Sequence, residues 1–486
     1  MKKIVNFGLF GIVLVALAMR LVIINQSFWL DEAIGAIVAK NLSFGQFFSQ
    51  FMRADNHPPL YYLTLKTWSG LFGYSEVALR SLSVILGIGT IFLVYLIARE
   101  LFKKDKFLVA ISIIFLATSP LHIYYSQEAR MYVMAGFFAA LAVLSFIKTL
   151  GENARPIWWA IFAISLPLLM FSDYMPVFLL PVFWLYGLID RKGRSWRIKF
   201  FFSHLPLLVL GIVWQPFFLL QIRTYGFQMA NFPAWKSVTG GATLKQLGLV
   251  WIKFVLGRIS FTNKPLYYLL IITLSVPFVF ILGKSAYLWK NVRLIWLWLI
   301  VPIVLGFVAS LWFPAFIYFR YIYVLPAFYL LLVWGIGAFK NRTFKIILAG
   351  LILLTNLGGW LIYATSPSQQ REDWRGATSF LHQNLKKNEI VLFEFGQPFA
   401  PYEWYSKDLA VSYGVLPQVP ADGIKSKKRV VELTKNVSGL YYFEYLRDLT
   451  DPQRYVESEL AKQGFRVAQV YSDFPGVGAI TYFTRD

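Results

Sequence analysis

The chain has 486 residues, of which 57% are hydrophobic and only 15% are charged, against roughly 45–50% and about 25% in soluble globular proteins. These values, with a mean hydropathy of +0.56, exclude a soluble, disordered or fibrous protein and indicate an integral membrane protein. The absence of cysteine excludes disulfides, thiolate catalysis and cysteine-ligated metal sites.

Eleven apolar segments have about the length that crosses a hydrocarbon core. They lie near residues 4–24, 79–98, 107–122, 131–148, 157–172, 175–189, 200–220, 265–283, 294–312, 321–339 and 345–365. The first segment has no small-residue cleavage site, so we expect it to be retained as a span. Residues 1–365 therefore form the predicted transmembrane domain.

The net charge of +22 belongs to the first 365 residues, because residues 366–486 carry 15 acidic and 15 basic side chains. With a cytoplasmic N-terminus, the inner loops hold 19 of the 32 basic residues before position 366, and Lys103–Lys106 and Arg191–Arg194 are the clearest clusters. This pattern follows the positive-inside rule. It favours membrane lipids as partners and gives no sign of a nucleic-acid surface.

The first outer loop, residues 25–78, is long and carries the pattern of interfacial helices. Apolar residues recur at helical spacing between Ile34 and Phe51, as in a helix that lies in the membrane interface. Pro58-Pro59 predicts the start of a second helix, with Asp55 or Asn56 as its cap.

The tail, residues 366–486, reads as a small α/β domain. Helices are expected at 373–387, at 428–437 and from Asp451-Pro452 to Gly464, and strands at 389–395, 439–446, 466–472 and 477–484. Neither a GxGxxG motif nor a Walker loop is present. Eleven spans would place this domain outside the cytoplasm.

Six of the ten acidic residues before position 366 lie at predicted outer span ends or in the first outer loop: Asp31, Glu32, Asp55, Glu76, Glu128 and Asp173. Ionisable groups near membrane depth are costly and mark a functional site. Asp31, with Glu32 beside it, could accept a proton from an attacking hydroxyl. Alternatively, Asp31 caps a helix that starts near Ala33.

Four cations accompany these acids: Arg53, His57, Arg130 and Arg320. We expect these cations to bind the phosphate of a lipid that carries a sugar. The N-terminus of the following helix would assist His57. Asp55, Glu128, Asp173 and Tyr61 would then bind the hydroxyl groups of the sugar. Some of these residues could instead have a purely structural role. His57 could be a partly buried structural residue, and Glu128 could form a salt bridge with Arg130. Arg320 could snorkel to the outer headgroups, and Asp173 could cap a helix.

The residues resemble a known family. Phe28-Trp29-Leu30-Asp31-Glu32 resembles the Asp-Glu motif of GT-C glycosyltransferases, and the nearest branch is similar to bacterial protein O-mannosyltransferases and lipid A aminoarabinose transferases. Further segments match that branch in kind and order: His57–Tyr62, Ala78–Arg80, Ser119-Pro120, Ser126–Tyr132, Arg320-Tyr321 and Asp373–Arg375.

The resemblance implies 11–13 spans, an outward active site in the cell membrane, and inverting transfer of a hexosyl or pentosyl group from a polyprenyl phosphate. Asp31 matches the family's catalytic Asp. His57 stands where some members have a phosphate-binding Lys, and a neutral His supplies less charge at pH 7. Some members bind a divalent metal, for which Asp31, Glu32 and His57 could be ligands, although their spacing matches no recognised metal motif.

The sequence is compatible with three function classes. An enzyme would transfer sugar to a hydroxyl of a protein, a lipid or a glycan. A flippase or transporter would use the same cations to bind lipid phosphate, but such proteins often contain paired repeats, and none is evident here. A structural or receptor protein would not need carboxylates gathered at the span ends.

Overall fold

The computed structural model describes residues 2–103, 105–151, 153–190, 192–231, 236–406 and 410–485. Lys104 and Arg191, from the two predicted inner clusters, lie outside this set. The chain divides into two compact units. The membrane unit comprises residues 1–24, 43–224 and 239–365, and the tail unit comprises residues 25–42, 225–238 and 366–486.

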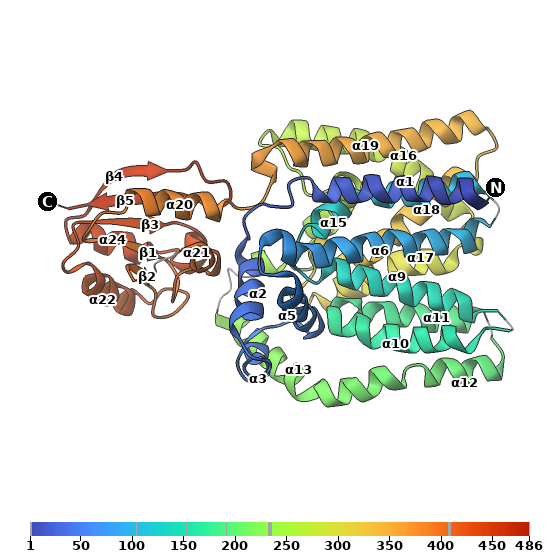
Figure 1. The fold of residues 1–486 in the computed structure, drawn as a ribbon, viewed down its shortest axis with the longest axis horizontal. Helices are drawn as coiled ribbons and strands as arrows, with labels where there is room; N and C mark the ends of the chain where they lie inside the picture. The colour runs from blue at the N-terminus through green and yellow to red at the C-terminus, as the bar shows by residue number, and fades with distance from the viewer. Residues whose placement is uncertain are drawn as a thin grey trace. The chain divides into compact units, whose positions relative to one another are not determined.

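All eleven predicted apolar segments form helices, and the long ones run side by side (Figure 1). They are α1 (Lys2–Leu21), α6 (Glu76–Phe102), α7 (Lys106–Thr118), α8 (Pro120–Ser126), α9 (Tyr132–Thr149), α10 (Pro156–Ser172), η2 (Met175–Leu179), α11 (Leu180–Ile189), α12 (Arg194–Phe202), α13 (Leu205–Asn231), α16 (Lys264–Tyr287), α17 (Arg293–Ala309), η5 (Tyr318–Val324), α18 (Leu325–Gly337) and α19 (Arg342–Thr365).

Among the described residues, six helical segments are long and apolar enough to cross a membrane, or seven if α7 and α8 form one bent span. Four further apolar helices are shorter. The predicted polytopic helical membrane protein is therefore confirmed.

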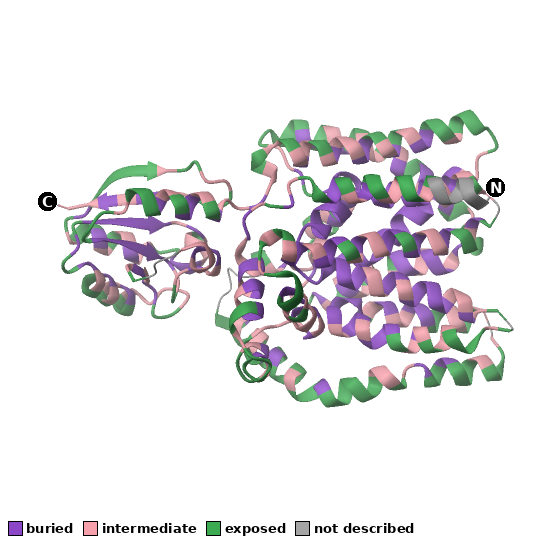
Figure 2. Ribbon diagram, viewed as in Figure 1, coloured by how far each residue is buried: buried purple, intermediate pink, exposed green. Residues whose placement is uncertain are grey.

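Burial separates central from peripheral helices in this bundle. The apolar window of Tyr318–Gly337 is 83% buried and that of α9 is 72% buried, whereas that of Arg194–Asn231 is only 6% buried. Figure 2 shows the same contrast between α9 and the exposed α12–α13. A helix that is apolar all round and exposed suits a lipid environment.

The predicted span 107–122 is bent by 55° between α7 and α8. Ser119 ends α7, and its side chain accepts a hydrogen bond from the backbone N–H of His122 at the start of α8. Pro120 occupies the first position of α8. A proline lacks the N–H and disfavours helical geometry in the preceding residue, which explains the break.

The first outer loop differs from the predicted continuous interfacial helix. Its elements are α2 (Leu30–Asn41), α3 (Phe44–Gln46), the π-helical turn η1 (Phe47–Phe51), α4 (Met52–Ala54) and α5 (Leu60–Phe72). Ser43 interrupts the pattern because it forms a capping box with Gln46 and starts a new helix. Other connecting helices are α14 (Lys236–Thr239), α15 (Leu244–Leu256), η4 (Trp289–Asn291) and η6 (Pro367–Gln369).

The tail unit contains a five-stranded sheet in the order β2-β1-β3-β5-β4. Its strands are β1 (Glu389–Phe393), β2 (Ser412–Gly414), β3 (Gly439–Phe443), β4 (Arg466–Tyr471) and β5 (Ile480–Thr484). β1 pairs in parallel with β2 and β3, while β5 is antiparallel to β3 and β4. The predicted α/β fold of the tail is confirmed.

Helices cover both faces of this sheet: α20 (Trp374–Asn384), α21 (Ala400–Tyr405), α22 (Gly423–Thr434), α23 (Arg447–Thr450) and α24 (Tyr455–Lys462). Alternate residues of a strand point to opposite faces. Phe393 therefore packs with Trp374 and Tyr402 on one side, whereas Leu392 packs with Val430 and Leu460 on the other.

The predicted helix start at Asp451-Pro452 is wrong by several residues. Helix α24 begins at Tyr455, after Arg454 in a left-handed conformation. The Asp451 carboxylate still bonds to the helix, because it accepts a hydrogen bond from the backbone N–H of Val456 at 2.9 Å. The three-residue strand β2 was not predicted, since so short a strand shows no periodicity.

Candidate active site

Asp55, His57, Arg130 and Tyr62 form a bonded polar group in the membrane unit. The His57 Nδ1 lies 3.1 Å from Asp55 Oδ2, and its Nε2 lies 3.4 Å from Arg130 Nη2. Arg130 Nη1 also donates to the Tyr62 hydroxyl at 2.9 Å. The Nδ1–H of the His57 ring can donate to the Asp55 carboxylate. The structure thus brings together three of the predicted site residues.

The local sequence explains how this group is held. The Asp55 carboxylate accepts the backbone N–H of His57 at 2.8 Å, which forms an Asx turn ahead of α5. Asp55 was predicted as a helix cap, but α5 has Pro59 at its N-cap position and no side-chain cap. The Asp55 side chain orients His57 instead.

Arg130 lies in the turn between α8 and α9 and is only 3% exposed. Gln127 fixes this turn, because its side-chain amide donates to the carbonyl of Arg20 at 2.9 Å. The Tyr363 hydroxyl donates to the Gln127 oxygen at 2.9 Å. Three segments distant in sequence therefore meet at the turn that carries Arg130.

Electrostatics favour an ionised Asp55. Burial opposes its ionisation, but the charge and hydrogen bonds of His57 and the charge of Arg130 outweigh burial and hold the pKa of Asp55 below its usual value. A buried guanidinium needs such a partner, since an unpaired charge in a low dielectric is costly.

A chain of hydrogen bonds connects this group to α13. Gln221 donates to the carbonyl oxygens of His57 and Met52, at 3.1 and 3.2 Å. The Tyr174 hydroxyl donates to Gln221 Oε1 at 2.6 Å and accepts from Trp214 Nε1 at 2.8 Å. The backbone of His57 is thus fixed by a polar network that extends to the peripheral helix.

Asp173 precedes Tyr174 and is 3% exposed. Its Oδ1 accepts the backbone N–H of Met175 at 3.2 Å. This is the kind of contact expected if Asp173 caps the helical segment that begins at Met175. It can also meet a ligand, since a carboxylate has capacity for several hydrogen bonds.

The other predicted residues of the membrane unit occupy different environments. Tyr61 and Glu128 are buried, and the Tyr61 ring meets Tyr62 edge-on at 6.1 Å. Arg320 is half-buried in η5, which contacts η2 and α9, whereas Arg53 is exposed in α4. Arg53 is therefore the most accessible of the predicted cations.

Asp31 and Glu32 belong to the tail unit, where they occupy the first turn of α2. The helix starts at Leu30, its N-cap is Trp29, and the N-cap makes no side-chain capping bond. The alternative that Asp31 caps a helix beginning near Ala33 is therefore wrong. Glu32 is fully buried, whereas Asp31 is half-buried and keeps access to solvent.

Sequence reasoning missed Lys253, a buried cation of α15. Its Nζ donates to the carbonyls of Arg258 and Ile259 at 3.2 and 2.9 Å and lies 6.0 Å from the centre of the Tyr318 ring. Burial, followed by the charge of Lys264, lowers the pKa of Lys253 to about 8. A lysine among the apolar positions of α15 was the available signal.

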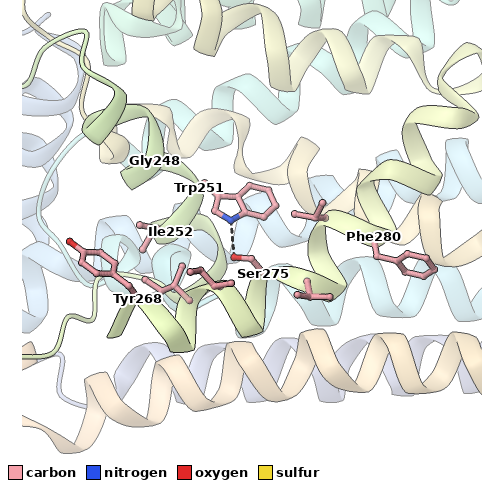
Figure 3. A pocket seen from close by; sticks show the side chains of 10 residues that line it. Gly248, Trp251, Ile252, Tyr268, Ser275 and Phe280 are labelled. Atoms are coloured by element: carbon pink, nitrogen blue, oxygen red, sulfur yellow. Dashed lines mark hydrogen bonds between the residues drawn. The ribbon is translucent and has the colours of Figure 1, made fainter. Parts of the chain in front are cut away.

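Two apolar grooves run along membrane helices. The first, of about 780 Å³, lies between α15 and α16, where Trp251 donates to the Ser275 hydroxyl and Tyr268 and Phe280 line either end (Figure 3). The second, of about 720 Å³, lies between α10–α11 and α12–α13 and includes Tyr174 and Trp214 in its lining. The second groove therefore reaches the network that fixes His57.

No group of three or more His, Asp or Glu side chains arranged to hold a metal ion occurs in the described part of the chain. The nearest contacts of the His57 ring nitrogens are to Asp55 and Arg130.

Comparison with known proteins identifies the fold. Residues 56–219 match the family model described as dolichyl-phosphate-mannose-protein mannosyltransferase. An uncharacterized protein of Aquifex aeolicus is 27% identical over 197 residues, and this match spans 39% of the chain and only 38% of that relative.

Two solved proteins share the architecture over nearly the whole chain. ArnT from Cupriavidus metallidurans bound to undecaprenyl phosphate is 13% identical with a TM-score of 0.60, and the match covers 99% of this chain and 98% of ArnT. The Archaeoglobus fulgidus oligosaccharyltransferase, complexed with Zn and sulfate, is 16% identical with a TM-score of 0.53 and matches over 98% of this chain and 72% of its own.

The similarity to these structures establishes the fold rather than the substrate. It agrees with the order of motifs in the sequence and with the matched family model. This chain is a multi-pass membrane protein with the GT-C fold, and its resemblance to the GT-C glycosyltransferases is confirmed.

Proposed function

We propose that this chain is a glycosyltransferase that moves a sugar from a polyprenyl-phosphate donor to a hydroxyl acceptor on the outer face of the cell membrane. The observation that carries the proposal is the buried contact of Arg130 with His57 and Tyr62 in a bundle with the GT-C fold. A guanidinium held in place by other side chains is suited to a phosphate.

The proposed reaction is a single displacement. The acceptor oxygen attacks the anomeric carbon, the bond from that carbon to the phosphate oxygen breaks, and the configuration inverts. Asp31 accepts the acceptor's proton, with Glu32 beside it. Arg130, Arg320, His57 and Arg53 stabilise the negative charge that develops on the departing polyprenyl phosphate.

Asp55, Glu128, Asp173 and Tyr61 would bind the sugar. Asp55 also orients His57, so it would couple sugar recognition to phosphate binding. The sugar, a hexose or a pentose, and the acceptor, a protein, a lipid or a glycan, define the specificity to be measured. Activity measured with and without a chelator tests whether a divalent metal takes part.

Two features support a lipid-linked donor. Apolar grooves lie along the membrane helices, and the one beside Tyr174 reaches the polar network of His57. A relative with the same fold was solved with undecaprenyl phosphate. A cavity with apolar walls and a few polar groups at one end is typical of a site for an amphiphile.

The test uses the full-length chain in liposomes that contain a polyprenyl-phosphate sugar in the leaflet corresponding to the outer face, with candidate acceptors added. An enzyme releases polyprenyl phosphate in proportion to a new glycoconjugate. Movement of intact donor between leaflets without cleavage would support a flippase instead. Asp190→Asn, in a predicted inner loop, is the control variant and should retain full activity.

A further inference from the structure

Helix α2, which carries Asp31, belongs to the same compact unit as the C-terminal domain. Its entry segment is attached to that domain by hydrogen bonds. Gln26 Oε1 accepts the backbone N–H of Arg371 at 2.7 Å, and the Ser27 hydroxyl donates to the carbonyl of Glu372. These contacts join residues more than 340 positions apart.

The start of α2 is fixed by α21. The backbone N–H of Phe28 donates to the Tyr405 hydroxyl at 2.8 Å, and the fully buried Phe28 ring meets the Trp404 ring edge-on at 5.6 Å. At the other end of α2, Lys40 Nζ lies 5.0 Å from the centre of the same Trp404 ring. One short helix of the tail thus contacts both ends of α2.

The residue directly before Asp31 is held by the core of the same domain. Leu30 packs against the cluster that contains Trp374 and Tyr445. Glu372 accepts from Tyr445 at 3.0 Å and from Trp374 Nε1 at 2.6 Å. Burial first, then Glu372 and Asp31, raise the pKa of Tyr445, so this hydroxyl stays protonated and donates to Glu372.

We propose that the C-terminal domain positions Asp31 for catalysis, and that Tyr405 is the main positioning residue because its hydroxyl fixes the backbone three residues before Asp31. The inference rests on the proposed function, in which Asp31 is the base. A carboxylate on an outer loop would otherwise sample many orientations, and displacement of a catalytic group by about 1 Å can cost 10²-fold in rate.

The test compares Tyr405→Phe with Tyr413→Phe in the full-length chain. Tyr413 belongs to the same sheet domain, but its hydroxyl donates to the carbonyl of Ala410 rather than to α2. The first readout is amide hydrogen exchange in the peptide that covers residues 27–33, which contains the bonded N–H of Phe28. The second readout is the enzyme kinetics, measured as kcat and as KM for the donor.

We expect faster exchange of this peptide and a kcat lowered by about 10-fold in Tyr405→Phe, with donor KM unchanged, and neither effect in Tyr413→Phe. Trp404→Leu should act in the same direction, because it removes the ring contacts of Phe28 and Lys40. Unchanged exchange in both Tyr405→Phe and Trp404→Leu would overturn the attachment of α2 to the domain.

The activity of Asp31→Asn separates failure of this inference from failure of the proposed function. If Asp31→Asn is inactive but Tyr405→Phe exchanges faster with normal kcat, the base assignment stands and positioning by Tyr405 is wrong. If Asp31→Asn is fully active, both the proposed function of Asp31 and its positioning are wrong, whatever the exchange shows.

Discussion

The two units fix their charged groups in different ways. In the membrane unit, His57 contacts both Asp55 and Arg130, so hydrogen bonds and opposite charges fix these side chains. In the tail unit, the helix of Asp31 is attached by backbone bonds and aromatic contacts, which leave the carboxylate half-buried. The difference matches the proposed roles, because a phosphate-binding cation can stay paired whereas a base must reach its substrate.

The largest effect in the membrane unit is expected at Arg130. Arg130→Lys keeps the charge but cannot reproduce the planar fork that contacts both Tyr62 and His57. We expect donor KM to rise by about 10-fold or more, as a lost charge-assisted contact of roughly 1.5–3 kcal/mol implies. Arg99→Lys, in a predicted inner loop, is the matched control, and equal behaviour of the two variants would contradict the assignment.

A smaller effect is expected from the coupling of Asp55 to His57. If the carboxylate acts by orienting the ring, Asp55→Asn and His57→Gln should be non-additive in kcat/KM, with a coupling energy of about 1 kcal/mol. The control cycle uses the exposed pair Glu100 and Lys148, which should show no coupling in activity. Additive effects of Asp55→Asn and His57→Gln would mean that the two residues act independently.

Glu394, in the tail unit, should show the smallest effect on activity but a distinct pH dependence of stability. Burial, followed by the charges of Asp451 and Glu457, raises the pKa of Glu394 to about 9, although its hydrogen bond from Tyr442 opposes the shift. Folded Glu394 therefore keeps a proton that the unfolded chain releases. Its contribution to stability is complete below about pH 4.5 and is lost as pH rises toward 9.

The measurement is hydrogen exchange of β1 and β3 in the full-length chain, corrected for the intrinsic pH dependence of exchange. Wild-type opening free energy should fall by up to about 1.4 kcal/mol per pH unit between pH 5 and 8.5. Glu394→Gln should flatten this slope. A wild-type slope as flat as that of the variant would show that Glu394 is not held protonated.

Most of the fold could be predicted because its signals are local. Apolar runs specified the membrane helices, and alternating helix and strand patterns specified the tail sheet. The break at Ser119-Pro120 also has a local cause, although apolar length alone concealed it. Asp451 shows the limit of local rules, because its carboxylate bonds to a helix that begins four residues later.

The contacts of the candidate site could be predicted only in part. The sequence indicated Asp55, His57 and Arg130 as polar residues at outer span ends, but the pairing of His57 with a residue 73 positions away depends on helix packing. Gln221 and Lys253 were missed because a lone amide or lysine in a long segment carries no pattern. The attachment of α2 to the tail was also unpredictable, since its partners lie more than 340 residues away.

The central claim is that Asp31 deprotonates the acceptor in a reaction that consumes a lipid-linked sugar. The most direct test measures release of polyprenyl phosphate and binding of the donor by the full-length wild type and by Asp31→Asn. We predict unchanged donor binding and release slowed by about 10²-fold or more in the variant. Release at the wild-type rate by Asp31→Asn would contradict the account.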